Sequence, residues 1–200
     1  TSGLFRTLDE ITVSASGYDD LDNDPDSTTF FWLINTLPQP SITGNTLSTS
    51  KFEKGDYVRV QCVANDGETN GTVLDSTRTL IENTPPVVSN VTGLSTTDMD
   101  GDGDDTTIVA GDTLTCSYDF DDDDGDPDDS TIEWTDGPSG SVLGSSSTLS
   151  SGFEYGMEIC CTVIADDDDD IGNTEQGCQT INNYLPQATN AAISSDYAAG

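Results

Sequence analysis

Histidine is absent from this chain of 200 residues, and lysine and arginine together number only five. Without histidine the sequence lacks the commonest general base of enzymes and a frequent ligand of zinc. Without basic clusters it cannot hold a nucleic acid backbone, which needs Lys and Arg against its phosphates. The sequence also has no Gly-x-Ser-x-Gly elbow and no phosphate-binding loop. We therefore expect a protein that is not an enzyme and does not bind nucleic acid.

Long apolar runs and helical periodicity are missing as well. No stretch is apolar over the length that spans a bilayer, so we expect no membrane insertion. Gly, Ser, Thr, Asn and Asp interrupt the chain about every eight to twelve residues, and short alternating segments lie between them. This pattern is typical of an all-β fold.

Acidic side chains, in contrast, are abundant: 38 Asp and Glu residues give a formal net charge of −33. Crowded carboxylates repel one another, so this charge either keeps the chain dissolved in high salt or is neutralised by bound cations. An acidic composition can also indicate disorder. Two Trp, six Phe and six Tyr residues within alternating β-branched segments favour packed β domains instead.

The sequence repeats itself after about 100 residues. Trp32 and Trp134 are 102 residues apart, and Pro86 and Pro186 are 100 residues apart. A fixed period of this length indicates tandem domains. We expect one domain over residues 1–84 and a second over 85–185. Residues 186–200 are expected to form either the first strand of a following repeat or a donor strand for the next subunit.

Short strands around a Trp on the third main strand indicate a two-sheet immunoglobulin-like sandwich. The fold class is therefore all-β, with two tandem immunoglobulin-like β-sandwich domains in a linear array. In the second copy, strands are expected near 87–93, 107–110, 113–119, 131–135, 147–150, 157–165 and 177–182; in the first copy, they are expected near 10–16, 28–35, 46–49, 56–64 and 77–82.

The first copy lacks a counterpart of one strand. Residues 87–94 supply the first strand of the second copy, and residues 187–194 correspond to them after a shift of 100. Two explanations remain open: the sequence is a window onto a longer array, or residues 186–200 fill the vacant sheet edge of the next molecule by strand addition.

Several motifs in the second copy carry a family resemblance. They are the Asp-rich loop 122–128, Trp134, the stretch Thr-Leu-Ser-Ser-Gly-Phe-Glu-x-Gly at 148–156, the Cys-Thr-Val strand at 161–163 and the Asn-x-x-Pro joint at 183–186. This pattern resembles the tandem PKD-like and cadherin-like immunoglobulin-fold repeats of large secreted prokaryotic surface proteins. The resemblance implies a calcium-dependent extracellular rod.

Five cysteines are present, four of them in the second copy. Successive strand residues point to opposite faces, and the apolar neighbours of Cys116 and Cys161 place both on inward faces. We therefore predict a Cys116–Cys161 bridge beside the core Trp. Cys160 and Cys178 then face outward on neighbouring strands, which predicts a Cys160–Cys178 bridge. Disulfides favour an oxidising compartment, so we expect an extracellular or cell-surface protein.

The first copy replaces these cysteines in pairs. Val13 and Val60 stand at the places of the inward pair, and Arg59 and Arg78 at those of the outward pair. The fifth cysteine, Cys62, has inward parity, and we expect a buried, inert thiol rather than a redox or intermolecular one.

The acidic residues are clustered in loops that recur in both copies. Calcium needs six to eight oxygen ligands, and carboxylates at alternate positions of a tight loop can converge on one ion. The candidate ligands are Asp20, Asp22, Asp24, Asp26 and Asp66 in the first copy; Asp122, Asp124, Asp126, Asp128 and Asp167 in the second; and Asp98, Asp100, Asp102 and Asp104 in a stretch like half an EF-hand loop. The alternative is a solvated acidic surface of a salt-adapted protein.

These observations predict an extracellular structural or adhesive protein, a calcium-stabilised immunoglobulin-like rod within a surface filament, fibre or S-layer. Its partners would be copies of itself joined head to tail as a homopolymer, or adjacent repeats of the same chain. The alternatives are a carbohydrate-binding module or spacer of a larger secreted protein or enzyme, and a fragment of a hydrolase. Asn70 and Asn90 begin sequons and are candidate glycosylation sites.

Overall fold

The computed structural model describes residues 4–97, 99, 107–184, 186 and 191–192. By contacts within the chain, it divides into two compact units. Unit 1 contains residues 1–87 together with two later loops, 120–130 and 165–173, and unit 2 contains residues 88–119, 131–164 and 174–200. Strands dominate both units, and the described part of the chain holds one helical element, the short 3-10 helix η1 (Thr49–Lys51).

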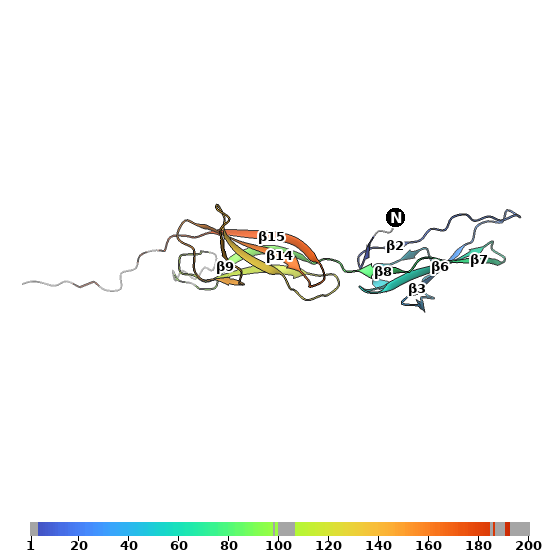
Figure 1. Ribbon diagram of the computed structural model, residues 1–200, viewed down its shortest axis with the longest axis horizontal. Helices are drawn as coiled ribbons and strands as arrows, with labels where there is room; N and C mark the ends of the chain where they lie inside the picture. Colours follow the sequence, from blue (N-terminus) through green and yellow to red (C-terminus); the bar gives the residue numbers. More distant parts are fainter. Residues whose placement is uncertain (1–3, 98, 100–106, 185, 187–190, 193–200) are drawn as a thin grey trace, which may run out of the picture. The chain divides into compact units, whose positions relative to one another are not determined.

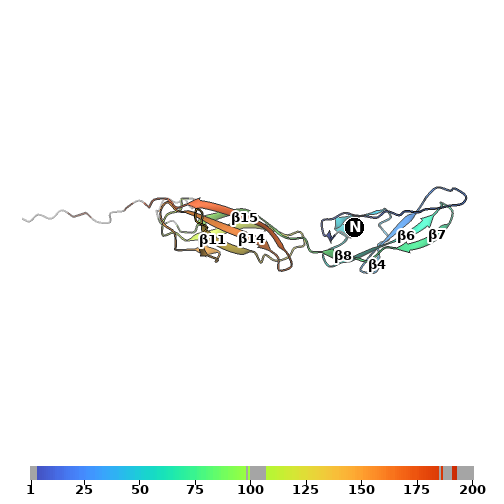
Figure 2. The same ribbon diagram turned by 45° about the horizontal axis from the view of Figure 1, so that its top comes forward.

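The first eight strands form two sheets in unit 1. They are β1 (Phe5–Arg6), β2 (Ile11–Thr12), β3 (Thr29–Ile34), β4 (Leu37–Pro38), β5 (Thr46–Leu47), β6 (Tyr57–Asn65), β7 (Asn70–Asp75) and β8 (Thr79–Glu82). The larger sheet has the order β1-β8-β6-β3-β4, and β7 also pairs with β6, beside which it lies in Figure 2. The smaller sheet consists of β2 and β5.

The core of this sandwich surrounds Trp32. Alternate residues of β6, Val58 and Val60, face Trp32 from the neighbouring strand, and Leu47 of the small sheet is fully buried against them. The indole N–H of Trp32 donates to the carbonyl of Gly44 at 2.9 Å, so this polar atom is satisfied inside the core. The alternation along the strands thus supplies one apolar face to each sheet.

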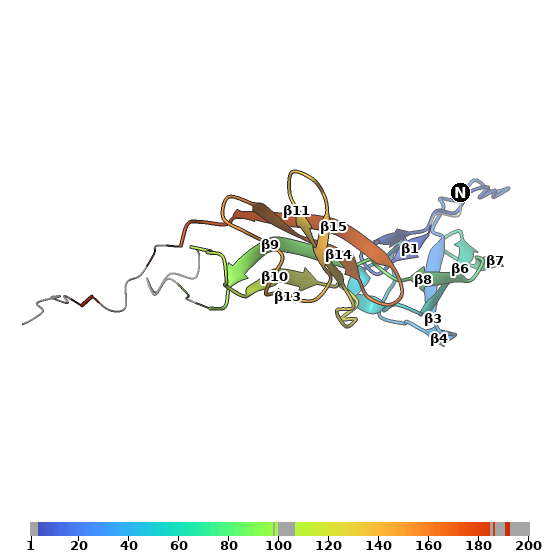
Figure 3. The same cartoon turned by 60° about the vertical axis from the view of Figure 1, so that its left-hand side comes forward.

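The remaining seven strands form a second two-sheet sandwich. They are β9 (Val87–Ser95), β10 (Leu114–Asp121), β11 (Thr131–Asp136), β12 (Val142–Gly144), β13 (Thr148–Leu149), β14 (Glu158–Asp166) and β15 (Ile171–Thr180). One sheet has the order β13-β10-β9 and the other β12-β11-β14-β15. Figure 1 shows β14 beside β15, and Figure 3 shows β9, β10 and β13 in one layer.

The two sandwiches repeat the same local structure. Trp134 is 1% exposed, and its indole N–H donates to the carbonyl of Ser146, twelve residues on, as Trp32 does to that of Gly44. Trp134 pairs with Cys161 across β11 and β14, as Trp32 pairs with Val60 across β3 and β6. The all-β, two-sheet architecture expected from the sequence is therefore confirmed.

Several strands differ from the expected ranges. The segment 10–16 forms only the short β2, and 107–110 contributes a single isolated bridge from Val109 to Asn182. Four strands were not expected: β1, β4, β7 and β12. β7 is exposed along its whole length, so its sequence carries no apolar alternation. In the described residues, no helix is long and apolar enough to cross a membrane.

Both expected disulfides are present, Cys116–Cys161 and Cys160–Cys178. Cys161 lies in the core, while Cys178 is exposed. Cys160 was expected on the outer face, yet it is only 2% exposed. Its strand β14 has a neighbour on each side, β11 and β15, so even a small outward side chain is covered there.

The expectation for Cys62 was only partly correct. It is a free thiol, but it is half-buried rather than buried. The small sheet is the reason: β2 ends at Thr12, so the far end of β6 has no paired strand of that sheet opposite it.

Candidate metal centre

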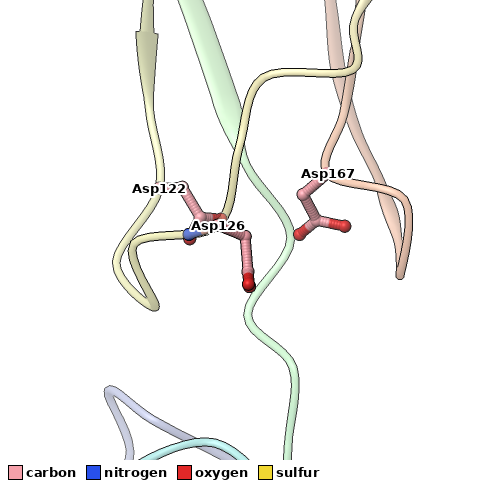
Figure 4. A group of neighbouring side chains, drawn as sticks. All are labelled: Asp122, Asp126 and Asp167. Atoms are coloured by element: carbon pink, nitrogen blue, oxygen red, sulfur yellow. The ribbon is translucent and has the colours of Figure 1, made fainter.

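Three carboxylates converge within unit 1. Asp122 and Asp126 lie on the loop that follows β10, and Asp167 lies on the loop between β14 and β15. One ligand oxygen of each lies within 4.8 Å of the others. Figure 4 shows Asp167 facing the pair from the neighbouring loop, with the segment that leads into β9 passing between the loops in this view. Asp167 is only 3% exposed, which is unusual for a carboxylate without a charged partner in direct contact.

Backbone N–H groups hold two of these carboxylates in place. Asp122 Oδ1 accepts from the N–H groups of Asp124 and Asp126, both at 2.9 Å. Asp167 Oδ1 accepts from those of Asp169 at 2.8 Å and Asp170 at 2.6 Å. Asp side chains commonly stabilise tight turns in this way. One oxygen of each carboxylate therefore fixes its loop. The second oxygen of Asp122 has no hydrogen-bond partner among the described residues, and that of Asp167 accepts from Asn83.

Several buried oxygens of these loops, and of the residues that hydrogen-bond to them, lack a hydrogen-bond partner among the described residues. They are Asp122 Oδ2, Asn83 Oδ1 and Thr84 Oγ1, all buried. Leaving a buried polar atom unsatisfied costs about 1–3 kcal/mol, and more for a charged one. A bound cation would satisfy such oxygens together, because a cation needs several oxygen donors at once.

Residues far away in the sequence complete the surroundings. Asn83 Nδ2 donates to Asp167 Oδ2 at 2.8 Å, and the N–H of Thr84 donates to Asp124 Oδ2 at 2.7 Å. Lys54 Nζ lies 2.5 Å from Asp126 Oδ2 and 2.7 Å from Asp169 Oδ2. One of the five basic residues of the chain thus contacts a member of the group of three converging carboxylates.

These contacts shift two pKa values. Burial by itself raises the pKa of Asp167. This effect is outweighed by hydrogen bonds from Asn83 and from the N–H groups of Asp170 and Asp169, together with the charge of Lys54, so the pKa of Asp167 is lowered overall. The hydrogen bonds of Lys54 with Asp126 and Asp169 raise the pKa of the ammonium group. At neutral pH, Asp167 is therefore ionised despite its burial.

The donor set suits a hard cation. Carboxylate, amide and hydroxyl oxygens are calcium ligands, whereas zinc prefers sulfur and nitrogen. Asp122, Asp126 and Asp167 with Asn83 and Thr84 offer oxygens of all three kinds. The residues present therefore fit calcium.

The corresponding loops of the first copy have the same backbone framework. Asp20 Oδ1 accepts from the N–H groups of Asp22 and Asp24, at 2.8 and 3.2 Å, as Asp122 does in the second copy. Asp66 Oδ1 accepts from Thr69 at 2.6 Å and Glu68 at 2.7 Å, and these bonds, that of Thr69 first, lower the pKa of Asp66. A polar hollow of about 340 Å³ lies between these two loops.

The other predicted ligands are not gathered into such a group. Among the described residues, the three second-copy carboxylates are the one set of at least three that converges. Asp22, Asp24 and Asp26 are exposed, Asp128 accepts the N–H of Ser130, and Asp124 bonds the Thr84 N–H and the Thr7 hydroxyl. Asp98, Asp100, Asp102 and Asp104 lie outside the described residues.

The sequence did not point to Lys54, Asn83 and Thr84 as part of the centre. Lys54 is 72 residues from Asp126, and Asn83 is 84 residues from Asp167. Asn83 and Thr84 belong to the predicted joint before Pro85, which is the one signal that could have identified them.

The predicted glycosylation sites lie on strands. Asn70 is exposed at the start of β7, and its Oδ1 accepts from Asn65 at 2.8 Å. Asn90 is exposed in β9 and donates from Nδ2 to Asp119 Oδ2 at 2.7 Å. Glycosylation of either asparagine stays a prediction.

Comparison with known proteins adds little to these observations. No protein family model matches the chain, and no curated protein matches it either. Among solved structures, it is similar to the crystal structure of the selenomethionine-substituted chicken interferon gamma receptor alpha chain. The two are 9% identical, with a TM-score of 0.47, over 90% of this chain and 95% of that one. The fold assignment therefore rests on the strand pairing described above.

Proposed function

We propose that this protein is an extracellular structural or adhesive module that calcium stabilises, and that it forms part of a surface filament, fibre or S-layer. The observation that carries the proposal is the convergence of Asp122, Asp126 and Asp167 around a buried Asp122 Oδ2 that accepts no hydrogen bond from the described residues. Calcium would supply the missing partner and offset the repulsion among the three carboxylates.

The compartment supports this proposal. Two disulfides within one small sandwich are typical of secreted and cell-surface proteins, because reducing compartments keep thiols free. Extracellular calcium modules have dissociation constants of about 0.1–1 mM, so they are occupied outside cells. A repeated sandwich with ions in its loops is suited to a mechanical rather than a catalytic role.

Calcium titration with thermal unfolding tests the proposal. The chelated protein is expected to gain about 2.7 kcal/mol of unfolding free energy when calcium reaches 100 times its dissociation constant. Asp122→Asn is expected to remove most of this gain, because it removes the negative charge of the carboxylate whose Oδ2 has no partner among the described residues. Asp123→Asn is the matched control, because Asp123 is exposed on the same loop and its substitution removes the same charge.

The control separates site binding from general charge screening. If Asp122→Asn and Asp123→Asn lose the same amount of the calcium-dependent gain, calcium acts on net charge alone and the proposal is wrong. If neither the wild type nor the variants respond to calcium, the acidic loops serve solubility in salt.

Lys54→Met gives a further test, because the ammonium group of Lys54 forms an ion pair with Asp126. In the absence of calcium, this variant is expected to lose about 1–3 kcal/mol of stability, as charged hydrogen bonds contribute. In the presence of calcium, the gain in unfolding free energy is expected to be larger than in the wild type, because Asp126 no longer pairs with Lys54 and can bind the ion. Thermal unfolding in chelator and in calcium measures both effects, with exposed Lys51→Met as control. An unchanged calcium gain would mean that Lys54 and the ion do not compete.

A further inference from the structure

Two of the five basic residues of the chain lie together on the outer face of the larger sheet of unit 1. Val58 and Val60 of β6 face the core, so Arg59 between them lies on the other face. The register of β6 with β8 pairs Val58 with Thr79, and the next pair in this register is Arg59 with Arg78. Like charges directly opposite each other on neighbouring strands are destabilising. A bound anion would offset this repulsion.

A pocket of about 160 Å³ lies beside these two side chains. Leu33, Thr36 and Tyr57 complete its lining. Leu33 is buried although it stands opposite Arg59 on the outer face of β3. The pocket therefore combines apolar side chains with two guanidinium groups. This combination suits a ligand that has an apolar part next to a carboxylate.

The carboxylates of unit 1 neutralise this pocket only in part. Arg59 Nη1 lies 3.4 Å from Asp75 Oδ1, and both side chains of this ion pair are more than a third exposed, so the pair contributes little. Arg78 forms no ion pair with any residue that the structure describes. Its guanidinium group stacks on the Tyr57 ring, 3.5 Å from the ring centroid. Stacking holds the guanidinium plane in place and leaves its N–H edge able to donate to a carboxylate.

The turn beside the pocket has an unfavourable backbone conformation. Asn35 and Thr36 join β3 to β4, and their φ angles are 49° and 74°. Two-residue hairpin turns with two positive φ angles favour glycine at the second position, whereas a β-branched residue rarely adopts such an angle. Thr36 thus keeps a hydroxyl and a methyl group in the pocket lining where the turn itself favours glycine. Strained residues of this kind are concentrated at binding sites.

The second sandwich is built without this pocket. Its outer face has a disulfide at the positions of the two arginines, and the apolar side chains are replaced as well: Cys160 and Cys178 correspond to Arg59 and Arg78, Thr135 to Leu33, and Glu158 to Tyr57. The fold therefore does not require an arginine pair at this place.

A loop of the same chain has the complementary chemistry. Leu21 is 93% exposed, more than any other large apolar side chain that the structure describes, and it stands between Asp20 and Asp22. Its counterpart in the second copy is Asp123, so this loop has no leucine there. The exposed leucine and the arginine pair are thus both found in the first copy and both missing from the second.

Leu21 cannot reach the pocket of its own chain. The N–H of Ser27 donates to the carbonyl of Asn65 at 2.8 Å, which fixes the base of the loop at the last residue of β6. The pocket lies at the other end of β6, at Tyr57. Eight residues of strand separate these ends by about 26 Å. A contact between Leu21 and the pocket therefore needs two chains.

We propose that Leu21 of one copy docks in the pocket of a second copy, where it packs against Leu33 while the Asp22 carboxylate pairs with the Arg78 guanidinium group. Each copy offers the loop at one end of β6 and the pocket at the other, so repetition of the contact joins copies in an open series. The inference rests on the proposed function for the role of such a fibre. The contact itself uses no calcium, and an ion bound to Asp22 would compete with it.

Sedimentation velocity of the 200-residue chain, in chelator and at about 0.15 M salt, tests this contact. The Debye length is then about 8 Å, so the net repulsion between copies is largely screened while charges in contact still attract. The wild type is expected to associate as its concentration rises. Arg78→Gln and Leu21→Asp should each raise the dissociation constant about tenfold or more. The matched controls are Lys51→Gln and Leu8→Asp, which make the same charge changes at exposed positions outside the loop and the pocket.

A mixture of the two variants gives the sharpest result. The Leu21→Asp chain keeps the pocket and the Arg78→Gln chain keeps the loop, so the mixture should form dimers of one chain of each kind that grow no further. A wild type that is monomeric at every concentration, a variant that associates as the wild type does, or a mixture that stays monomeric while the wild type associates would overturn the inference.

Two further outcomes keep the alternatives apart. If oligogalacturonate binds the monomeric wild type and not Arg78→Gln, the pocket belongs to an acidic saccharide and docking between copies is wrong. The calcium titration depends on Asp122 and on the stability of a single chain, whereas this contact depends on Leu21 and Arg78. Either proposal can therefore fail while the other stands.

Discussion

Replacing Cys116 and Cys161 together by valine is expected to lower the unfolding free energy of the second sandwich by about 4 kcal/mol. The bond closes a loop across 45 residues, and chain-entropy arguments give a loss of this size when such a loop is opened. Valine is the sharpest replacement, because the first sandwich has Val13 and Val60 at the corresponding positions. Packing is then nearly preserved, and the change reports mainly the covalent link.

Denaturant unfolding of the oxidised protein, followed by tryptophan fluorescence, measures this effect. Cys62→Val is the control, because Cys62 is a free thiol in the first sandwich. Its replacement should leave the unfolding transition of the second sandwich unchanged. A loss below about 1 kcal/mol in the double variant would contradict the account, because the inter-sheet bond would then contribute little beyond the packing of two valines.

Gly177→Ala is expected to destabilise the second sandwich by about 3 kcal/mol or more. The added Cβ would lie 2.1 Å from the carbonyl oxygen of Val91 and 2.9 Å from the Cα of Thr92. Both are backbone atoms of β9, so no side-chain rotation can relieve the overlap, and the strand has to move away from Trp134. Losing β9 from the core exposes Val88 as well.

Hydrogen exchange locates this effect, since the amides of β9 should lose protection before those of β14. Gly44→Ala is the matched control, because a Cβ there meets nothing closer than the Thr46 nitrogen at 3.9 Å. If Gly177→Ala has the stability of the wild type, β9 does not lie against β15 as described.

Local patterns were sufficient to predict the core from the sequence. The pairing of Cys116 with Cys161 follows from side-chain alternation, and the recurrence of Trp32 as Trp134 fixes the register of the two copies. The Trp residues and the alternation of the strands occur in both copies, whereas the inter-sheet disulfide occurs only in the second. β7 was missed because all its residues are exposed and no apolar period marks it.

The candidate site was predicted less completely, for a physical reason. Asp122, Asp126 and Asp167 could be identified because carboxylate spacing in loops is a local signal. The partners Lys54 and Asn83 come from segments 72 and 84 residues away, and only the packed chain brings them to the carboxylates. The incomplete burial of Cys62 has a similar origin, because it depends on how far the opposite sheet extends.

The acidic loops also show why repetition alone does not establish a site. Asp20 and Asp122 each accept two backbone N–H groups in the same turn, so the two copies share a framework. The carboxylates of the second copy converge where Asn83 lies against Asp167.

Anomalous diffraction from crystals grown in excess calcium tests the central claim most directly. The account predicts a peak at about 2.3–2.6 Å from oxygens of Asp122, Asp126 and Asp167, which is the usual calcium–oxygen distance. Asn83 Oδ1 or Thr84 Oγ1 should complete the coordination shell. A well-ordered map in which these carboxylates contact only water and Lys54, with no anomalous peak between them, would contradict it.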